Sequence, residues 1–146
     1  MLAESIRDII VNTPAAVSGL ATWEFSSGVS EPAVFTNMRT PPTGKRISVE
    51  VMESGGIHWG VRGYPGKDAV VSVRVMGNKN VSQTPLRTAA DAIYDALHRQ
   101  TTGLDLYTRP RGYEGIAVLA EPLSSIIDED GFPGYLIALR VLVMKL

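Results

Sequence analysis

The segment GYLIALRVLVMKL (residues 134–146) decides the fold of this chain. Its odd-numbered positions from Tyr135 to Val143 are apolar, and so are its even-numbered positions from Leu136 to Met144, apart from Arg140. Side chains alternate between the two faces of a strand. Apolar residues on both faces are typical of a strand that is covered on both sides. The segment therefore predicts a strand at the centre of a sheet.

The residues just before this segment predict a neighbouring strand. IAVLAEPL and SSII (116–127) form one apolar stretch that is interrupted at Pro122. DEDG (128–131) follows, and Asp and Gly are residues that tight turns favour. We expect residues 116–146 to form two strands joined by an acidic turn.

Two earlier segments alternate in the same way. ISVEV (47–51) and AVVSVRVMG (69–77) place valines on one side and polar residues mostly on the other, which predicts two half-buried strands. PAVFT (32–36) predicts a short strand or an extended packing segment. Between the two alternating segments, ESGGIHWGVRGYPGKD (53–68) holds five glycines and a proline. That density predicts an irregular loop, at most with an irregular hairpin in its middle.

Two segments have helical periodicity. In TPLRTAADAIYDALHRQTTG (84–103), apolar residues recur at three- and four-residue spacing, with Thr84 as the expected N-cap, Pro85 at the first helical position and Gly103 as the terminator. A shorter apolar face predicts a helix over about residues 2–12. The chain is thus expected to be a single α+β domain (1–146), a sandwich in which a sheet of about four strands packs against two helices.

Composition excludes several classes of protein. The chain has no cysteine and a net charge of −1, which argues against disulfides, zinc–thiolate sites and a dedicated nucleic-acid binder. Neither a signal peptide nor an apolar run of about 18 residues is present in the sequence. We expect a soluble protein made in the cytoplasm, with no membrane contact.

No stretch of the sequence has the residue spacing of a known motif for catalysis, metal binding or cofactor binding. DEDG places its glycine too early for an EF-hand loop. Only His58 and His98 are available, without a Ser nucleophile elbow or an H-x-x-x-H pair; His98 is expected to interact with the last carbonyls of its helix. PPTGKR departs from the phosphate-binding loop at Arg39 and Arg46. We therefore expect no enzyme, no metal and no cofactor.

The charges are unevenly placed, which suggests contacts between proteins. Residues 39–79 carry seven basic and three acidic side chains, whereas residues 114–130 carry five acidic and no basic ones. Arginine and large aromatics are common at protein interfaces. The candidate interface residues are Arg39, Lys45, Arg46, His58, Trp59, Arg62, Tyr64, Lys67, Asp128, Glu129 and Asp130. An alternative for the loop at 53–68 is that Trp59 only covers the core; contact with nucleic acid is a third possibility.

Three stretches carry a resemblance to a known family: PAVFTNMRTPP (32–42), RTAADAIYDALHRQ (87–100) and EPLSSIIDEDGFPGYLIALRVLV (121–143). With them, the chain resembles the tail terminator family, also called tail completion or minor tail proteins, of long-tailed phages and gene-transfer particles. The resemblance runs over essentially the whole chain, and the loop at 53–68 is covered least.

The resemblance implies a structural virion protein at the tail–neck junction. Family members are α/β sandwiches that form a hexameric ring on the head-proximal end of the tail tube. The implied partners are other copies of the chain, the tail tube protein and the head–neck connector, with DNA only as cargo in the lumen. Two alternatives remain: another head–tail joining protein, and a small-molecule-binding or enzymatic α+β domain with a pocket beneath residues 53–68.

Overall fold

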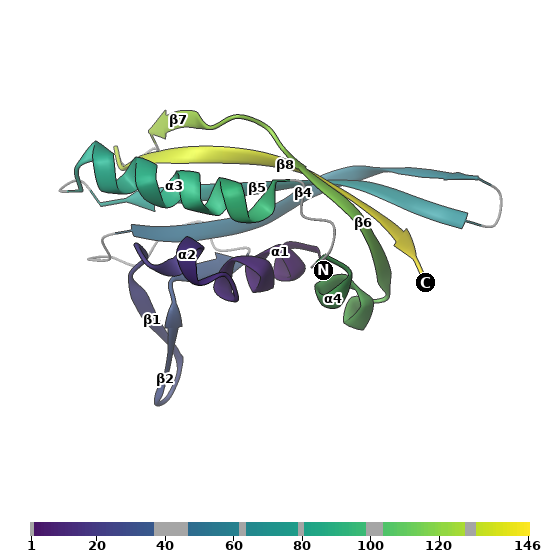
Figure 1. Cartoon of the computed structure of the whole chain (residues 1–146), viewed down its shortest axis with the longest axis horizontal. Coiled ribbons are helices and arrows are strands. Elements are labelled where there is room, and N and C mark those ends of the chain that lie inside the picture. Colours follow the sequence, from purple (N-terminus) through teal and green to yellow (C-terminus); the bar gives the residue numbers. More distant parts are fainter. Residues whose placement is uncertain (1, 37–46, 62–63, 79–80, 99–103, 128–130) are drawn as a thin grey trace.

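A computed structural model describes residues 2–36, 47–61, 64–78, 81–98, 104–127 and 131–146; for residues 55–61, 64 and 65 it describes the backbone alone. The helices lie together on one side of a large, twisted sheet, and a long hairpin extends beyond them at one end (Figure 1). The N-terminus lies beside the sheet, close to the helical segment that precedes the last strands (Figure 1).

The main sheet has six strands, where the sequence predicted about four. Its order is β3-β4-β5-β8-β6, and β7 also pairs with β8. The bounds are β3 (Val34–Thr36), β4 (Ile47–Val61), β5 (Tyr64–Gly77), β6 (Tyr113–Ala120), β7 (Ser124–Ile127) and β8 (Pro133–Lys145). Every pairing is antiparallel except that of β3 with β4, which is parallel. A separate hairpin, β1 (Thr22–Ser26) and β2 (Val29–Pro32), forms its own two-stranded sheet.

Strand β8 occupies the central position that its sequence predicted, between β5 on one side and β6 and β7 on the other. The expectation that both of its faces are covered was wrong. Its odd-numbered side chains from Tyr135 to Val143 are buried, but Leu136, Ala138, Leu142 and Met144 are only half-buried and Arg140 is exposed. The helices all pack on the first face, which leaves the second face apolar and partly open.

The core lies between this covered face and the helices. The sheet contributes fully buried valines and leucines, among them Val71, Val73 and Leu139. Helix α1 (Leu2–Val11) contributes Ile6 and Ile10, and the helix Gln83–Leu97 (α3) contributes a further set, Leu86, Ala90, Ile93 and Leu97. These are the positions that helical periodicity places on one side, so the two predicted helices are confirmed.

Two short helices were not predicted. Helix α2 (Pro14–Val17) begins at Pro14, and α4 (Leu104–Thr108) leads into the 3-10 turn η1 (Arg109–Arg111). The start of α3 also differs from the prediction, because its N-cap is Ser82 and not Thr84. Thr84 and Pro85 lie inside the first turn, where proline is tolerated because the first amides have no intrahelical partner. The helix ends at Leu97, and the predicted terminator Gly103 lies outside the described residues.

The segment 53–68 is the largest correction. It forms the outer part of the β4–β5 hairpin, in which residues pair in continuous register from Gly56↔Ala69 to Val61↔Tyr64. The irregularity is confined to a bulge between Glu53 and Gly56. Backbone pairing with β5, and of β5 with β8 as far as Gly66↔Met144, outweighs the weak strand preference of glycine. We call residues 52–61 of β4, with their partners 64–72 of β5, the arm.

Candidate assembly surfaces

Most of the predicted interface residues either lie outside the described residues or are described by their backbone alone. Arg39, Lys45, Arg46 and Arg62 lie outside the described residues, as do Asp128, Glu129 and Asp130. His58, Trp59 and Tyr64 belong to the arm, where their backbones pair with Lys67, Gly66 and Val61, respectively. The predicted contact between a basic segment and the acidic turn therefore stays a prediction.

Lys67 is the one predicted interface residue whose side chain is described. Its Nζ lies 2.6 Å from Glu53 Oε1, and Glu53 Oε2 accepts a hydrogen bond from the Leu2 backbone amide at 3.2 Å. The Glu53 side chain is nearly buried and that of Lys67 is partly buried. Glu53 thus joins the base of the arm to the start of α1, and Lys67 pairs with Glu53 within the arm.

The β1–β2 hairpin projects from the body of the molecule on the side of α1 and α2 (Figure 1). The rings of Trp23 and Phe25 on β1 pack against the buried Phe35, with centroids 6.0 and 5.2 Å away. Phe25 and Val29 are nevertheless 39% and 50% exposed. The hairpin therefore offers apolar side chains to solvent.

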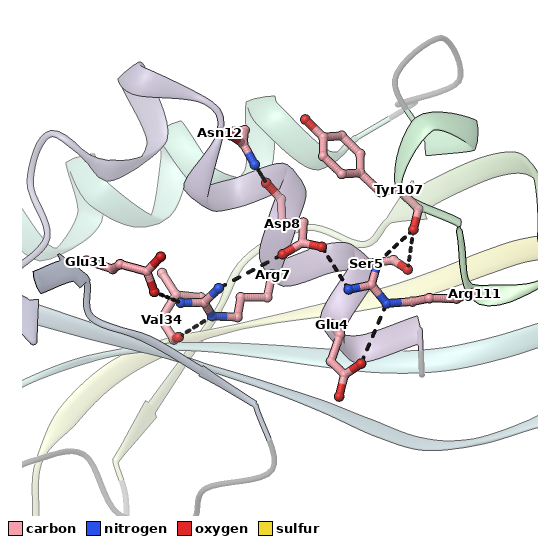
Figure 2. Close-up of polar contacts among 9 residues, drawn as sticks. All are labelled: Glu4, Ser5, Arg7, Asp8, Asn12, Glu31, Val34, Tyr107 and Arg111. Atoms are coloured by element: carbon pink, nitrogen blue, oxygen red, sulfur yellow. Dashed lines mark hydrogen bonds and ion pairs between the residues drawn. The ribbon is translucent and has the colours of Figure 1, made fainter. Parts of the chain in front are cut away.

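Helix α1 is held at both sides by a chain of ion pairs, which Figure 2 shows. On one side, Arg7 donates to the Val34 carbonyl at 2.8 Å and to Glu31 Oε2 at 3.1 Å. On the other side, Arg111 donates to Asp8 Oδ2 at 2.9 Å and to the Tyr107 carbonyl at 2.8 Å. These contacts join α1 to β2 and β3 on one flank and to the α4–η1 segment on the other.

The sheet face opposite the helices carries an exposed apolar region around one ion pair. Val70 on β5 and Leu119 on β6 are 40% and 39% exposed, and both are paired in register with Arg140 on β8. Arg140 binds Asp68 through both carboxylate oxygens, with Nε 3.3 Å from Oδ1. Asp68 is nearly buried on this face, and the bidentate contact with Arg140 supplies hydrogen-bond donors to both of its carboxylate oxygens.

The outer edge of β6 is closed by two side chains that accept hydrogen bonds from its backbone. The Gly115 amide donates to Asp105 Oδ1 at 3.0 Å, and the Ala120 amide donates to His98 Nδ1 at 3.1 Å. The hydrogen bond from Arg109, followed by that from Gly115, lowers the pKa of Asp105 and keeps it ionised as an acceptor. These two caps cover the edge near both of its ends.

His98 differs from its predicted role. Its backbone amide does donate to the Tyr94 carbonyl at 2.8 Å, but its ring stacks on Tyr94 and binds β6 instead of the last helical carbonyls. Since Nδ1 accepts the Ala120 proton, the imidazole carries its own proton on Nε2. No signal in the sequence could have paired His98 with Ala120, because the contact depends on where α3 ends above β6.

Several strand edges lack a pairing strand within the described part of the chain, among them those of β4 and β7. Strand β3 covers β4 only at residues 49–51, and no described strand pairs with that edge of β4 beyond Val51. Strand β7 pairs with β8 along one edge, and most of its side chains are exposed, Ile127 to 75%. Unpaired edges present backbone donors and acceptors that can bind another strand.

Two surface cavities are lined by described residues. One, of about 440 Å³, lies at Trp23, Glu24, Ser26 and Ser27 on the β1–β2 hairpin. The other, of about 320 Å³, lies between α2 and α3 and is lined by small side chains such as Ala15, Gly19 and Thr88. Neither is lined by a described histidine. Among the described residues, no group of three potential metal ligands occurs and no helix is long and apolar enough to cross a membrane.

Among the comparisons with known proteins, only the comparison of structures gives matches. No family model matches the sequence, and no curated protein matches it. Solved structures do match, and among them is a chain of a structure titled "Virion of native gene transfer agent (GTA) particle". The likeness has a TM-score of 0.69 at 13% identity and covers 98% of this chain and 94% of the other. This chain therefore shares its fold, over almost its whole length, with a component of that virion.

Proposed function

We propose that this protein is a structural component of a phage-like virion, and more specifically a tail terminator. In that role, copies of the chain form a ring, with six as the expected number, on the head-proximal end of the tail tube. The ring ends tube growth and presents a surface to the head–neck connector. DNA passes through its lumen as cargo.

One observation carries the proposal: the fold is shared with a chain of a gene transfer agent virion over nearly the full length of both chains. Two features of the molecule support an assembly role. It bears projecting elements, the arm and the β1–β2 hairpin, and within the described residues it leaves one sheet face and several strand edges open, among them those of β4 and β7. The residues of the arm, the basic segment at 39–46 and the acidic turn at 128–130 are the contacts we expect between subunits and with neck proteins.

The proposal is tested by electron microscopy of particles assembled in a host from which the coding sequence has been deleted. We expect tail tubes of uncontrolled length that carry no heads, and restoration of normal tails when the intact sequence is supplied in trans. Tails of normal length that fail to join heads would contradict the terminating role and favour a head–tail joining protein. Complete, infectious or DNA-transferring particles would contradict a role in the virion altogether.

A further inference from the structure

One of the two caps on the edge of β6 works only while a histidine is neutral. The backbone amide of Ala120, the last residue of β6, donates to His98 Nδ1 at 3.1 Å. A neutral imidazole has one acceptor nitrogen, whereas a protonated imidazole carries a proton on both nitrogens and accepts nothing. Histidine is also the side chain whose charge ordinarily changes between about pH 5 and 8. The half-buried ring of His98 can exchange that proton with solvent.

The end of α3 offers favourable surroundings to the charged form of the same ring. His98 is the C-cap of α3, and its backbone amide donates to the Tyr94 carbonyl at 2.8 Å. The last carbonyls of a helix have no intrahelical partner and carry the negative end of the helix dipole, so they stabilise a cation. Stacking on Tyr94, with ring centroids 5.0 Å apart, keeps the imidazole beside this end of the helix. Both protonation states of His98 therefore have something to bind.

We infer that His98 is a pH-sensitive switch that closes the end of the β6 edge when neutral and releases it when protonated. In the neutral state the ring joins the end of α3 to Ala120. In the protonated state the ring and the amide would both be donors, so the hydrogen bond is lost and the ring turns toward the carbonyls of α3. The switch belongs to the single chain and goes beyond the proposed function, which neither requires it nor follows from it.

The other ionisable groups near the ring do not share its pH range. On α3, Tyr94 contacts the ring and the exposed Asp95 lies three residues before it. Beyond β6, the exposed Glu121 follows the last residue of the strand. From β8, Arg140 is exposed on the sheet face that the helices leave open. Because carboxyl groups ordinarily titrate near about pH 4 and tyrosine and arginine above about pH 10, histidine is the type in this set that changes charge between them.

The two caps on β6 should respond differently to acid, and the difference makes the release local. Asp105 accepts from the Gly115 amide at 3.0 Å, and its lowered pKa keeps it ionised over the range in which a histidine titrates. Acid therefore removes the cap at Ala120 and leaves the cap at Gly115. The freed amide lies where the chain leaves β6 for β7 (Figure 1). An unpaired amide at a strand edge is available to another acceptor.

Hydrogen exchange of single backbone amides, followed by NMR on the full chain, tests the switch. Each rate is measured at about pH 8 and at about pH 5, and is divided by the intrinsic rate of that amide at the same pH. We expect the protection of Ala120 to fall about tenfold between the two conditions, because one hydrogen bond is lost. The protection of Gly115 should stay unchanged, which makes it the control within the same molecule.

Substitutions of the two histidines separate the switch from a general effect of acid. His98→Asn supplies an acceptor oxygen that does not titrate, as many bonds from the backbone as Nδ1, so Ala120 should stay protected in both conditions. His98→Ala removes the acceptor and should leave Ala120 about tenfold less protected in both. His58→Asn changes the only other histidine of the chain and should keep the native response of Ala120.

Three results would each overturn the inference: equal changes at Ala120 and Gly115, an unchanged Ala120, or a native response in His98→Asn. If the His98 variants do not fold, the comparison of Ala120 with Gly115 in the native chain decides alone. None of these results bears on the deletion experiment, so the proposed function and the switch stand or fall separately.

Discussion

Leu139 and Leu142 lie three residues apart on the same strand, yet they belong to different environments. Leu139 is buried between the sheet and the helices, whereas Leu142 on the opposite face is half-buried and faces away from the helices. The same alternation on β5 buries Val71 and leaves Val70 exposed. An apolar residue on a central strand thus does not show by itself which face the protein covers. The covered face should account for stability, and the open face is available for contacts with other proteins.

Truncation of the two leucines gives the largest expected difference between the faces. Leu139→Ala should destabilise the fold by about 3 kcal/mol, because it removes buried methyl groups and leaves a cavity. Leu142→Ala should cost about 1 kcal/mol, since part of its surface is already in water. Urea denaturation of both variants measures the difference. Equal losses would mean that the second face is covered as well as the first.

Gly134 lies on the open face, yet its substitution should destabilise the protein in the way that substitution of a core residue does. A Cβ at Gly134 would lie 2.3 Å from Met76 Sδ and 2.7 Å from the Val75 carbonyl oxygen. The backbone atom cannot move aside cheaply, so Gly134→Ala should destabilise by about 1–3 kcal/mol. Ala138→Ser, on the same face and strand, is the control and should stay within about 0.5 kcal/mol of the native protein. A neutral Gly134→Ala would show that the β5–β8 contact is looser than its register indicates.

Helix α1 covers the sheet at the side of the core, and ion pairs on both of its flanks hold it there. Arg111→Met removes the contacts to Asp8 and to the Tyr107 carbonyl while keeping most of the apolar stem. We expect a loss of about 1 kcal/mol, since these hydrogen bonds are charged but partly solvated. Hydrogen exchange should accelerate in α1 before it does in β8. Uniform acceleration throughout the protein would instead indicate that α1 does not open separately.

The smallest expected effect concerns pH and the cap on β6. The hydrogen bond from Arg109 lowers the pKa of Asp105 in the folded state, so the unfolded state binds the proton more tightly. This contribution is fully present above the usual pKa of an aspartate and is lost as pH falls through the lowered folded value. Asp105→Asn should therefore flatten the acid side of the stability curve below about pH 4. An unchanged acid slope would mean that the cap does not depend on charge.

The sequence predicted those parts of the fold that depend on local pattern. The apolar stripe of α3, the alternation of Val71, Val73 and Val75, and the central place of β8 were all predictable, because burial leaves a period in the sequence. The start of α3 was misplaced by two residues, because Ser82 and Thr84 are both suitable caps and packing chose between them.

The parts that could not be predicted depend on contacts distant in sequence. The glycine-rich arm was predicted to be a loop, because its strand conformation is imposed by partners on β5 and β8 and not by its own composition. The caps on β6 come from residues 10 and 22 positions away, on other elements. The ion pair of Lys67 with Glu53 was not predicted either, and the place of Lys67 at an interface stays a prediction.

The position of β8 in the sequence has a consequence for how the protein folds. Its partners on β5 precede it by 58 residues at Met76↔Gly134 and by 78 residues at Gly66↔Met144. The β4–β5 hairpin can form early from local contacts, but the sheet is completed only by a strand that a ribosome makes after every other described element. Non-local pairing of this kind slows folding. Until β8 pairs with β5, the unpaired edge of β5 can bind other chains and lead to aggregation. Expression at low temperature or with a chaperone should therefore raise the yield of folded protein more than any stabilising change in α1.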